Sequence, residues 1–256
     1  MIRPASLLVL LTAALWVGHS CQKSNHSGNN NNNGGLATQP TAQAGFDNQS
    51  GGVYKGTLTG SSGYFEVNLQ ETKPFIIYQW MTPQGNIDSL FTTSLGSWSS
   101  GQAITKAVFT ATDGSLFWFS VNGDGSSPSI DSVYITGHTG PVYASIAKEL
   151  STSLLKVYQG AATVTGGGTG CFDGITTMWT IGSVGAFSYL GTDGTFGAGT
   201  VSISGNQAQV VLGANAGNGT NNETTGTLTI SADGSTLSGT VTGKTCVHAV
   251  SLTRIL

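Results

Sequence analysis

The chain has 256 residues, a net charge of −3, and only 8% charged residues, against roughly 25% in average globular chains. The chain has no excess of positive charge, which excludes nucleic acids and anionic membrane surfaces as partners that it would hold by long-range electrostatics. The 38 glycines and 6 prolines are typical of extracellular β-proteins built from short strands and tight turns.

The first 20 residues have the layout of a signal peptide. Arg3 provides a positive start, residues 7–17 are apolar, and the small residues Gly18 and Ser20 precede Cys21. About 11 apolar residues are too few for a permanent membrane helix, which needs roughly 20. We therefore expect residues 1–20 to direct export and to be removed.

The residues around Cys21 resemble the bacterial lipoprotein signal, in which a cysteine after a small residue is acylated and becomes the new N-terminus. The stretch reads Val17-Gly18-His19-Ser20-Cys21, with Gly18 where the family usually has Leu. The resemblance implies an exported protein of the cell envelope, held at a membrane, such as the outer membrane, by lipid on Cys21. Ordinary cleavage after Ser20 is the alternative and would release a soluble secreted protein.

A Gly- and Asn-rich segment follows the cysteine. Residues 24–35 include five consecutive asparagines and almost no apolar side chain, so they cannot form a core. We expect residues 21–50 to act as a flexible tether that holds a folded domain away from the membrane.

From Val53 onward, short runs of alternating apolar and polar residues are separated by Gly, Asp-Gly and Asn-Gly turns. This period of two predicts half-buried strands and an all-β fold. Residues 144–155 could also support a short helical connection. The predicted strands are 53–59, 64–71, 75–81, 87–95, 103–111, 116–121, 132–136, 142–148, 157–164, 172–181, 186–190, 195–203, 208–212, 226–230, 237–242 and 247–254.

The two halves of this region resemble each other. The run Val53-Tyr54-Lys55-Gly56 matches Val157-Tyr158-Gln159-Gly160, and Asp124-Gly125-Ser126 matches Asp233-Gly234-Ser235, at offsets that drift from 104 to 109 residues. We interpret residues 51–150 and 157–256 as tandem repeats. About eight strands in each repeat favour two antiparallel β-barrels, which have no exposed edges. A pair of β-sandwiches would give nearly the same list of strands.

Two short motifs resemble strands of avidin-like and lipocalin-like barrels. They are the Tyr-x-Gly opening of each repeat and the run from Gly234 to Gly243. The resemblance implies small up-and-down barrels, and neither biotin nor lipid specificity follows from it.

The three cysteines fit an oxidising compartment. With Cys21 lipidated, Cys171 and Cys246 remain as a pair, and a disulfide closing so long a loop is worth about 4 kcal/mol in the chain-entropy model. Two buried free thiols are the alternative. No CxxC or HxxxH spacing accompanies them, so we expect no metal site. Residues 122–126 offer alternating oxygen atoms, but Val133 stands where a calcium loop needs a bidentate carboxylate.

We find no catalytic motif and expect neither an enzyme nor a bound cofactor. His138 and His248 lie in the folded part, but no Gly-x-Ser-x-Gly sequence marks a nucleophile. Gly166–Gly170 lacks the lysine of a phosphate-binding loop. Carboxylates that could act in glycoside hydrolysis are scattered over different strands and turns: Glu66, Glu71, Asp88, Asp131 and Asp173.

Aromatic residues are the best candidates for binding a ligand. Tyr78 and Trp80 lie in one almost wholly apolar strand and Trp118 in another. Because neighbours in a strand point to opposite faces, some of these rings must point outward, where they could stack on sugars or contact a protein. Packing between the two repeats is the alternative. Trp98, in a predicted loop, is the candidate we expect to be most exposed.

The sequence thus predicts a non-enzymatic envelope lipoprotein that presents a binding or structural surface on its β-domains. We expect it to contact the membrane through its lipid only and to bind a glycan or an envelope protein, but no nucleic acid. A secreted hydrolase or lyase that acts on glycans is one alternative. A small-molecule carrier with an apolar barrel interior is another.

Overall fold

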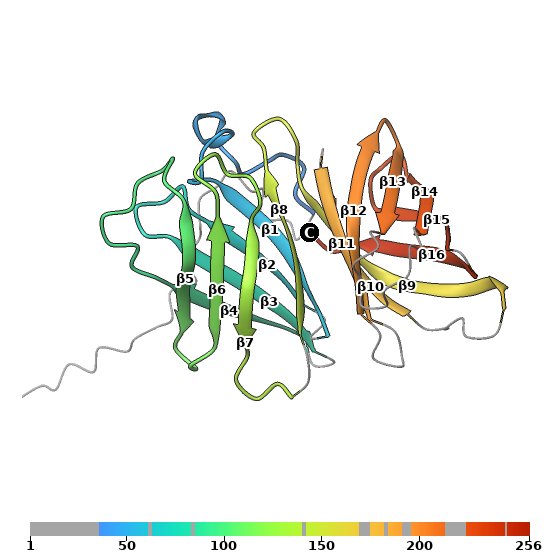
Figure 1. Cartoon of the computed structure of the whole chain (residues 1–256), viewed down its shortest axis with the longest axis horizontal. Helices are drawn as coiled ribbons and strands as arrows, with labels where there is room; N and C mark the ends of the chain where they lie inside the picture. Colours follow the sequence, from blue (N-terminus) through green and yellow to red (C-terminus); the bar gives the residue numbers. More distant parts are fainter. Residues whose placement is uncertain are drawn as a thin grey trace, which may run out of the picture. The chain divides into compact units, whose positions relative to one another are not determined.

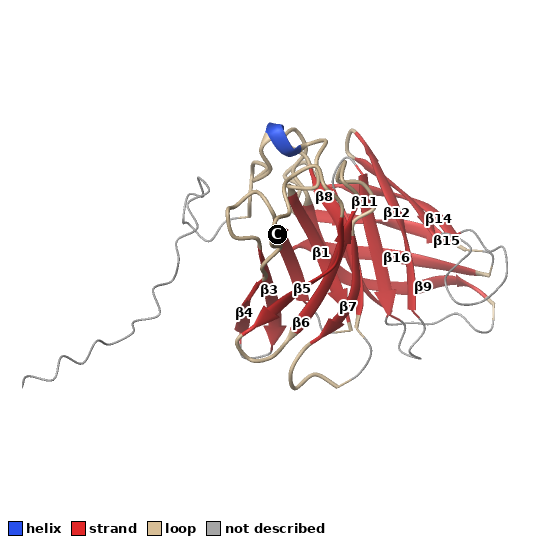
Figure 2. Ribbon diagram, turned by 60° about the vertical axis from the view of Figure 1, so that its left-hand side comes forward, coloured by secondary structure: helices blue, strands red, loops and turns tan. Residues whose placement is uncertain are grey.

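The computed structural model describes residues 36–60, 63–82, 85–139, 142–168, 175–181, 184–190, 196–212, 224–243 and 245–256. The predicted signal peptide, Cys21, the first part of the tether and Cys171 lie outside these ranges. The described residues form sixteen strands and one short 3-10 helix, η1 (Ala44–Phe46) (Figures 1 and 2). Among these residues, no helix combines the length and the apolar character needed to cross a membrane.

The first half of the chain forms an eight-stranded antiparallel sheet in the order β7-β6-β5-β4-β3-β2-β1-β8. Strands β1 to β7 therefore pair in chain order, and β8 pairs with β1, so that β7 and β8 form the two edges of the sheet. The strands are β1 (Val53–Thr59), β2 (Gly63–Asn68), β3 (Phe75–Thr82), β4 (Gly85–Thr92), β5 (Ile104–Ala111), β6 (Leu116–Val121), β7 (Ser129–Tyr134) and β8 (Tyr143–Glu149).

The second half forms a closed barrel in the order β10-β11-β12-β13-β14-β15-β16-β9. This is the strand order of the first sheet, with β9–β16 in the places of β1–β8. The difference is that β15 pairs with β16 and closes the barrel. The strands are β9 (Lys156–Gly167), β10 (Ile175–Ile181), β11 (Val184–Leu190), β12 (Phe196–Ser204), β13 (Gln207–Leu212), β14 (Thr224–Ile230), β15 (Thr236–Thr242) and β16 (Cys246–Arg254).

The predicted all-β fold with two antiparallel sheets is confirmed. Apolar and polar residues alternate along the strands, so that one face of each sheet can be buried. Strand β6 is an example: Phe117, Phe119 and Val121 are buried inside the first sheet, whereas Trp118 points to the other face. The ring centroid of Phe117 lies 4.8 Å from that of Phe91 and 5.9 Å from that of Tyr78. Aromatic packing of this kind fills the inside of the first sheet.

Strand β1 is buried on both faces. Tyr54 and Leu58 point into the first core, and the alternate residues point the other way, where β1 lies against β10 of the second half. The hydroxyl groups of Thr59 and Ser188 form a hydrogen bond of 2.5 Å on this side. The two sheets therefore share a packed boundary along β1.

The structure corrects the predicted helical connection and several strand boundaries, of which β7 is an example. Residues 144–155 form no helix, because β8 extends to Glu149 in register with β1 and a turn follows, closed by the N–H of Ser153 on the carbonyl of Leu150. Strand β7 begins at Ser129, three residues earlier than predicted. It ends before Thr136 because the N–H of Thr136 donates to Ser115 Oγ instead of continuing the ladder.

The described end of the predicted tether packs against the first sheet. Thr41 and Ala42 donate their N–H groups to the Glu149 carboxylate, at 2.7 and 3.2 Å. Ser50 is fully buried and donates its N–H to the carbonyl of Gly123. The low apolar content of this segment could not predict these contacts, because they are hydrogen bonds to backbone groups and to one carboxylate and not apolar packing.

Candidate functional site

The structure separates the four aromatic candidates. Tyr78 is buried in the first core, and the side chain of Trp80 lies outside the described residues. Trp98 does lie in a loop, but it is half-buried, packs against the first core and donates its indole N–H to the carbonyl of Gln102 at 3.0 Å. Trp118 is the candidate whose described side chain lies on the outer face of the first sheet.

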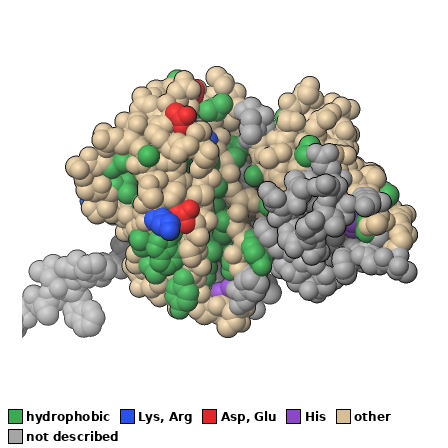
Figure 3. Space-filling view, viewed as in Figure 1, with side chains coloured by type: hydrophobic (Ala, Val, Ile, Leu, Met, Phe, Trp, Pro, Cys, Tyr) green, Lys and Arg blue, Asp and Glu red, His purple; other side chains and the backbone are tan. Residues whose placement is uncertain are grey.

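Trp118 belongs to an apolar patch on the outer face of β5, β6 and β7. Val108 lies opposite Trp118 across β5 and β6, and Tyr134 lies opposite Leu116 across β6 and β7. Val108 is 41% exposed and Tyr134 is 54% exposed. We call these four residues the β5–β7 patch, and Figure 3 shows apolar side chains gathered over these strands.

Polar side chains border the patch and are held by hydrogen bonds. Lys106 lies at an irregularity of β5 with a φ of 51°, an uncommon conformation for a residue other than glycine. Its N–H donates to Ser120 Oγ at 2.8 Å, and that hydroxyl donates to the Asp131 carboxylate. Ser129 Oγ donates to the same carboxylate at 2.8 Å. The patch thus lies beside an ordered carboxylate and an exposed lysine.

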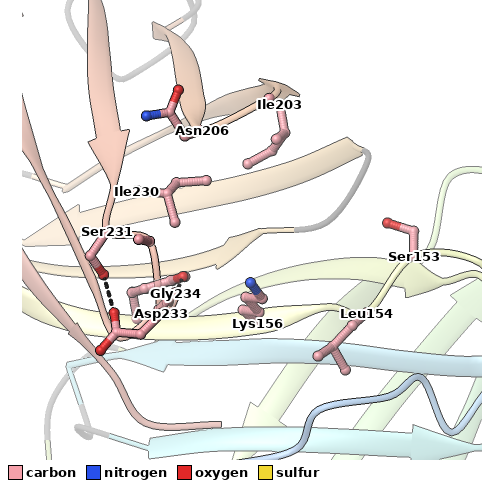
Figure 4. Close-up of a pocket in the computed structure, with 12 residues that line it drawn as sticks. Ser153, Leu154, Lys156, Ile203, Asn206, Ile230, Ser231, Asp233 and Gly234 are labelled. Atoms are coloured by element: carbon pink, nitrogen blue, oxygen red, sulfur yellow. Dashed lines mark hydrogen bonds between the residues drawn. The ribbon is translucent and has the colours of Figure 1, made fainter.

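A pocket of about 440 Å³ lies at one end of the second barrel, where the turns after β12 and β14 meet the start of β9. Figure 4 shows Lys156 between Leu154 on one side and Asp233 on the other. The Tyr158 hydroxyl donates to the carbonyl of Gly234 at 2.8 Å and fixes the turn. The only sign of this pocket in the sequence is a lysine directly before the second repeat.

The surroundings of the pocket stabilise the charged form of Asp233 and destabilise the charged form of Lys156. Hydrogen bonds from Ser231 and Ser235 lower the pKa of Asp233 to about 2, so this carboxylate is ionised at neutral pH. Burial, and then the positive charge of Arg254, lower the pKa of Lys156. The structure records no hydrogen bond from the Lys156 ammonium to any described residue.

The histidine and cysteine candidates do not come together in one site among the described residues. His248 lies within β16, opposite Val241, whereas His138 follows β7 at the other half of the chain. Cys246 begins β16 and is disulfide-bonded, but Cys171 lies outside the described residues, so their pairing stays a prediction. In the part of the chain that the structure describes, no three His, Cys, Asp or Glu side chains gather as metal ligands would.

The loop that offered alternating oxygen atoms is a tight turn. The carboxylate of Asp124 accepts the N–H of Ser126 at 2.9 Å, and Lys148 lies against Gly125. A lysine ammonium therefore occupies the space beside this turn.

No protein-family model, curated protein or solved structure matches the chain. The resemblance to avidin-like and lipocalin-like barrels therefore stays a prediction, as does the resemblance to the lipoprotein signal.

Proposed function

We propose that the protein is a non-enzymatic lipoprotein of the cell envelope, anchored at Cys21, that binds a glycan on the β5–β7 patch. The observation that carries this proposal is that the half-buried Trp118 and the exposed Tyr134 lie on the outer face of one sheet, beside Lys106 and Asp131. Rings that are apolar on their faces and polar at one edge suit a ligand with both CH and OH groups.

The size of the patch favours a glycan over a protein. Tyr134 is 54% exposed and Trp118 is half-buried, so these two rings and the two aliphatic side chains offer at most about 300 Å² of apolar area, since a whole aromatic side chain accounts for 150–250 Å². A stable protein interface needs roughly 800 Å² on each partner. A sugar chain needs less apolar area, because the hydroxyl and charged groups at the border supply hydrogen bonds.

The carrier alternative has less support from the first sheet. Its interior is filled by large side chains, among them Phe65, Phe109 and Phe119, each fully buried. A filled core leaves no room for a ligand inside. The hydrolase alternative gains no support from Glu149, whose carboxylate is buried in an ion pair with Lys55.

Tryptophan fluorescence titration with soluble fragments of bacterial envelope glycans tests the proposal. We expect one class of fragment to bind, and the Trp118→Ser and Tyr134→Ser variants to bind at least tenfold more weakly. Val211→Ser is the control, because Val211 is exposed to a similar degree on the second barrel. Flat responses to every glycan, or equal losses in Val211→Ser, would reject the proposal.

A further inference from the structure

Two β-bulges lie on either side of β6 in the first sheet. On one side, β5 places two residues, Thr105 and Lys106, opposite Ser120 alone. On the other side, β7 inserts Asp131 as an extra residue next to the partner of Trp118. Lys106 and Asp131 are exposed, and Figure 3 shows a basic and an acidic group beside the apolar side chains over these strands. The bulges therefore bring two opposite charges to the border of the β5–β7 patch.

The fold itself does not require these bulges. Strands β13, β14 and β15 hold the corresponding places in the second half, and they pair without any shift in register. Their outward residues at this level are the uncharged Gln209, Thr227 and Thr240. Because bulges redirect side chains and are common beside functional sites, the charged border is a special feature of the first half.

The backbone of Lys106 is strained. Its φ is 51°, and ten of the twelve described residues with a positive φ are glycines. Glycine adopts this conformation without a steric cost, whereas a residue with a Cβ atom does so at a cost in free energy. Such residues gather at ligand-binding sites, where the surrounding structure holds them in place. The lysine side chain is therefore the reason we infer for a residue other than glycine at this position.

The two charged groups differ in how well they are satisfied. The Asp131 carboxylate accepts hydrogen bonds from Ser120 Oγ and from Ser129 Oγ, which leaves room for further donors among its roughly four lone-pair sites. The N–H of Lys106 donates to Ser120 Oγ at 2.8 Å and fixes the backbone beside the patch. For the Lys106 ammonium, the structure records no hydrogen bond or ion pair with any described residue. The site thus offers a free positive charge next to a partly occupied negative one.

Building on the proposed glycan site, we propose that its ligand is an acidic glycan in which a negatively charged sugar lies next to a neutral one. The acidic group binds the Lys106 ammonium through charge-assisted hydrogen bonds. Hydroxyl groups of the neutral sugar donate to Asp131, and the sugar rings lie on Trp118. The Asp131 carboxylate repels a second negative charge, so a chain with an acid on every sugar is disfavoured.

Isothermal titration calorimetry of the full chain with three tetrasaccharides tests the inference. The first alternates glucuronic acid and N-acetylglucosamine, the second is the same molecule with its carboxyl groups reduced to alcohols, and the third is tetragalacturonate. We expect the first to bind about tenfold more tightly than either of the others, as one well-formed charged contact allows. Lys106→Met should abolish this preference, and Lys73→Met, which removes an exposed lysine elsewhere in the first half, should leave it unchanged.

Urea unfolding separates lost binding from misfolding. Lys106→Gly should unfold at a higher urea concentration than Lys106→Ala, because glycine alone relieves the strain at a φ of 51°. Both variants should lose the preference for the acidic tetrasaccharide. Ser127→Gly relieves the other described residue with a positive φ that is not glycine, and it should keep the binding of the wild type.

Three results would overturn the inference: equal binding of the acidic and reduced tetrasaccharides, a preference that survives Lys106→Met, or no binding of the acidic tetrasaccharide. Equal binding that is lost in Trp118→Ser would leave the glycan site of the β5–β7 patch in place and reject only the role of Lys106. Flat responses in the wider glycan titration would reject both proposals.

Discussion

The buried ion pair between Lys55 and Glu149 gives the sharpest test of how the chain is held together. The two side chains are 1% and 0% exposed, and Lys55 Nζ lies 2.6 Å from Glu149 Oε2. The same carboxylate accepts hydrogen bonds from Thr41, Ala42 and Leu155. One side chain thus joins β1, the segment before the first sheet and the connection to the second barrel.

Removing either partner leaves the other charge buried, which costs about 3–5 kcal/mol of unfolding free energy. We expect Lys55→Met to lie near 3 kcal/mol, because the carboxylate keeps its donors from Thr41, Ala42 and Leu155. Glu149→Gln should lie near 5 kcal/mol, since the new amide NH2 must face donors and the Lys55 ammonium loses its counter-charge.

Urea unfolding of both single variants and of the double variant measures the coupling. The double variant should lose about 2 kcal/mol less than the sum of the single losses, because the second substitution removes the charge that the first leaves unpaired. Lys73→Met, at an exposed lysine, should change stability by less than about 0.5 kcal/mol. A loss below about 1 kcal/mol for Lys55→Met, or additive losses, would refute the reasoning.

Three further outcomes follow from the described contacts. Phe117→Ala should lower the unfolding free energy in urea by about 3–5 kcal/mol, because its ring packs on three others in the first core. Lys148→Met should cost about 1.5–3 kcal/mol and speed amide hydrogen exchange at Ser50, since the turn around η1 loses its shared donor. The stability contributed by Asp233 should be present above pH 3.8 and be lost as the pH falls toward 2, because its folded pKa of about 2 lies below the ordinary aspartate pKa of 3.8. Asp233→Asn should remove that part of the acid sensitivity of the unfolding free energy.

Each of these outcomes has a result that contradicts it. A loss below about 1 kcal/mol for Phe117→Ala would mean that the ring is not part of a tight core. Unchanged exchange at Ser50 in Lys148→Met would mean that the lysine does not hold the preceding turn. An Asp233→Asn variant with the acid profile of the wild type would show that the carboxylate has the same pKa in both states.

The strands could be predicted because the chain alternates apolar and polar residues between Gly-rich turns. β1 and β6 begin and end at the predicted residues, since both are bounded by residues that favour turns. The errors fall where tertiary contacts decide the outcome. Residues 144–149 have helix-forming side chains, yet pairing with β1 makes them a strand.

The candidate sites were harder to predict because they depend on contacts between distant residues. The sequence did suggest that Trp118 could point outward, but it did not show that Tyr134 would lie on the same face. Lys55 and Glu149 are 94 residues apart, and neither position shows its pairing locally. The pocket depends on what covers the end of a barrel, and no pattern of alternation contains that information.

The central claim is that the ring of Trp118 lies on the face that receives the ligand. The indole N–H resonances of the tryptophans in an NMR titration with the envelope glycans test it most directly, with Trp118→Phe to assign one signal. We predict that the Trp118 resonance shifts on binding while that of Trp98, hydrogen-bonded to the carbonyl of Gln102, stays in place. A glycan that binds without moving the Trp118 resonance would contradict the claim.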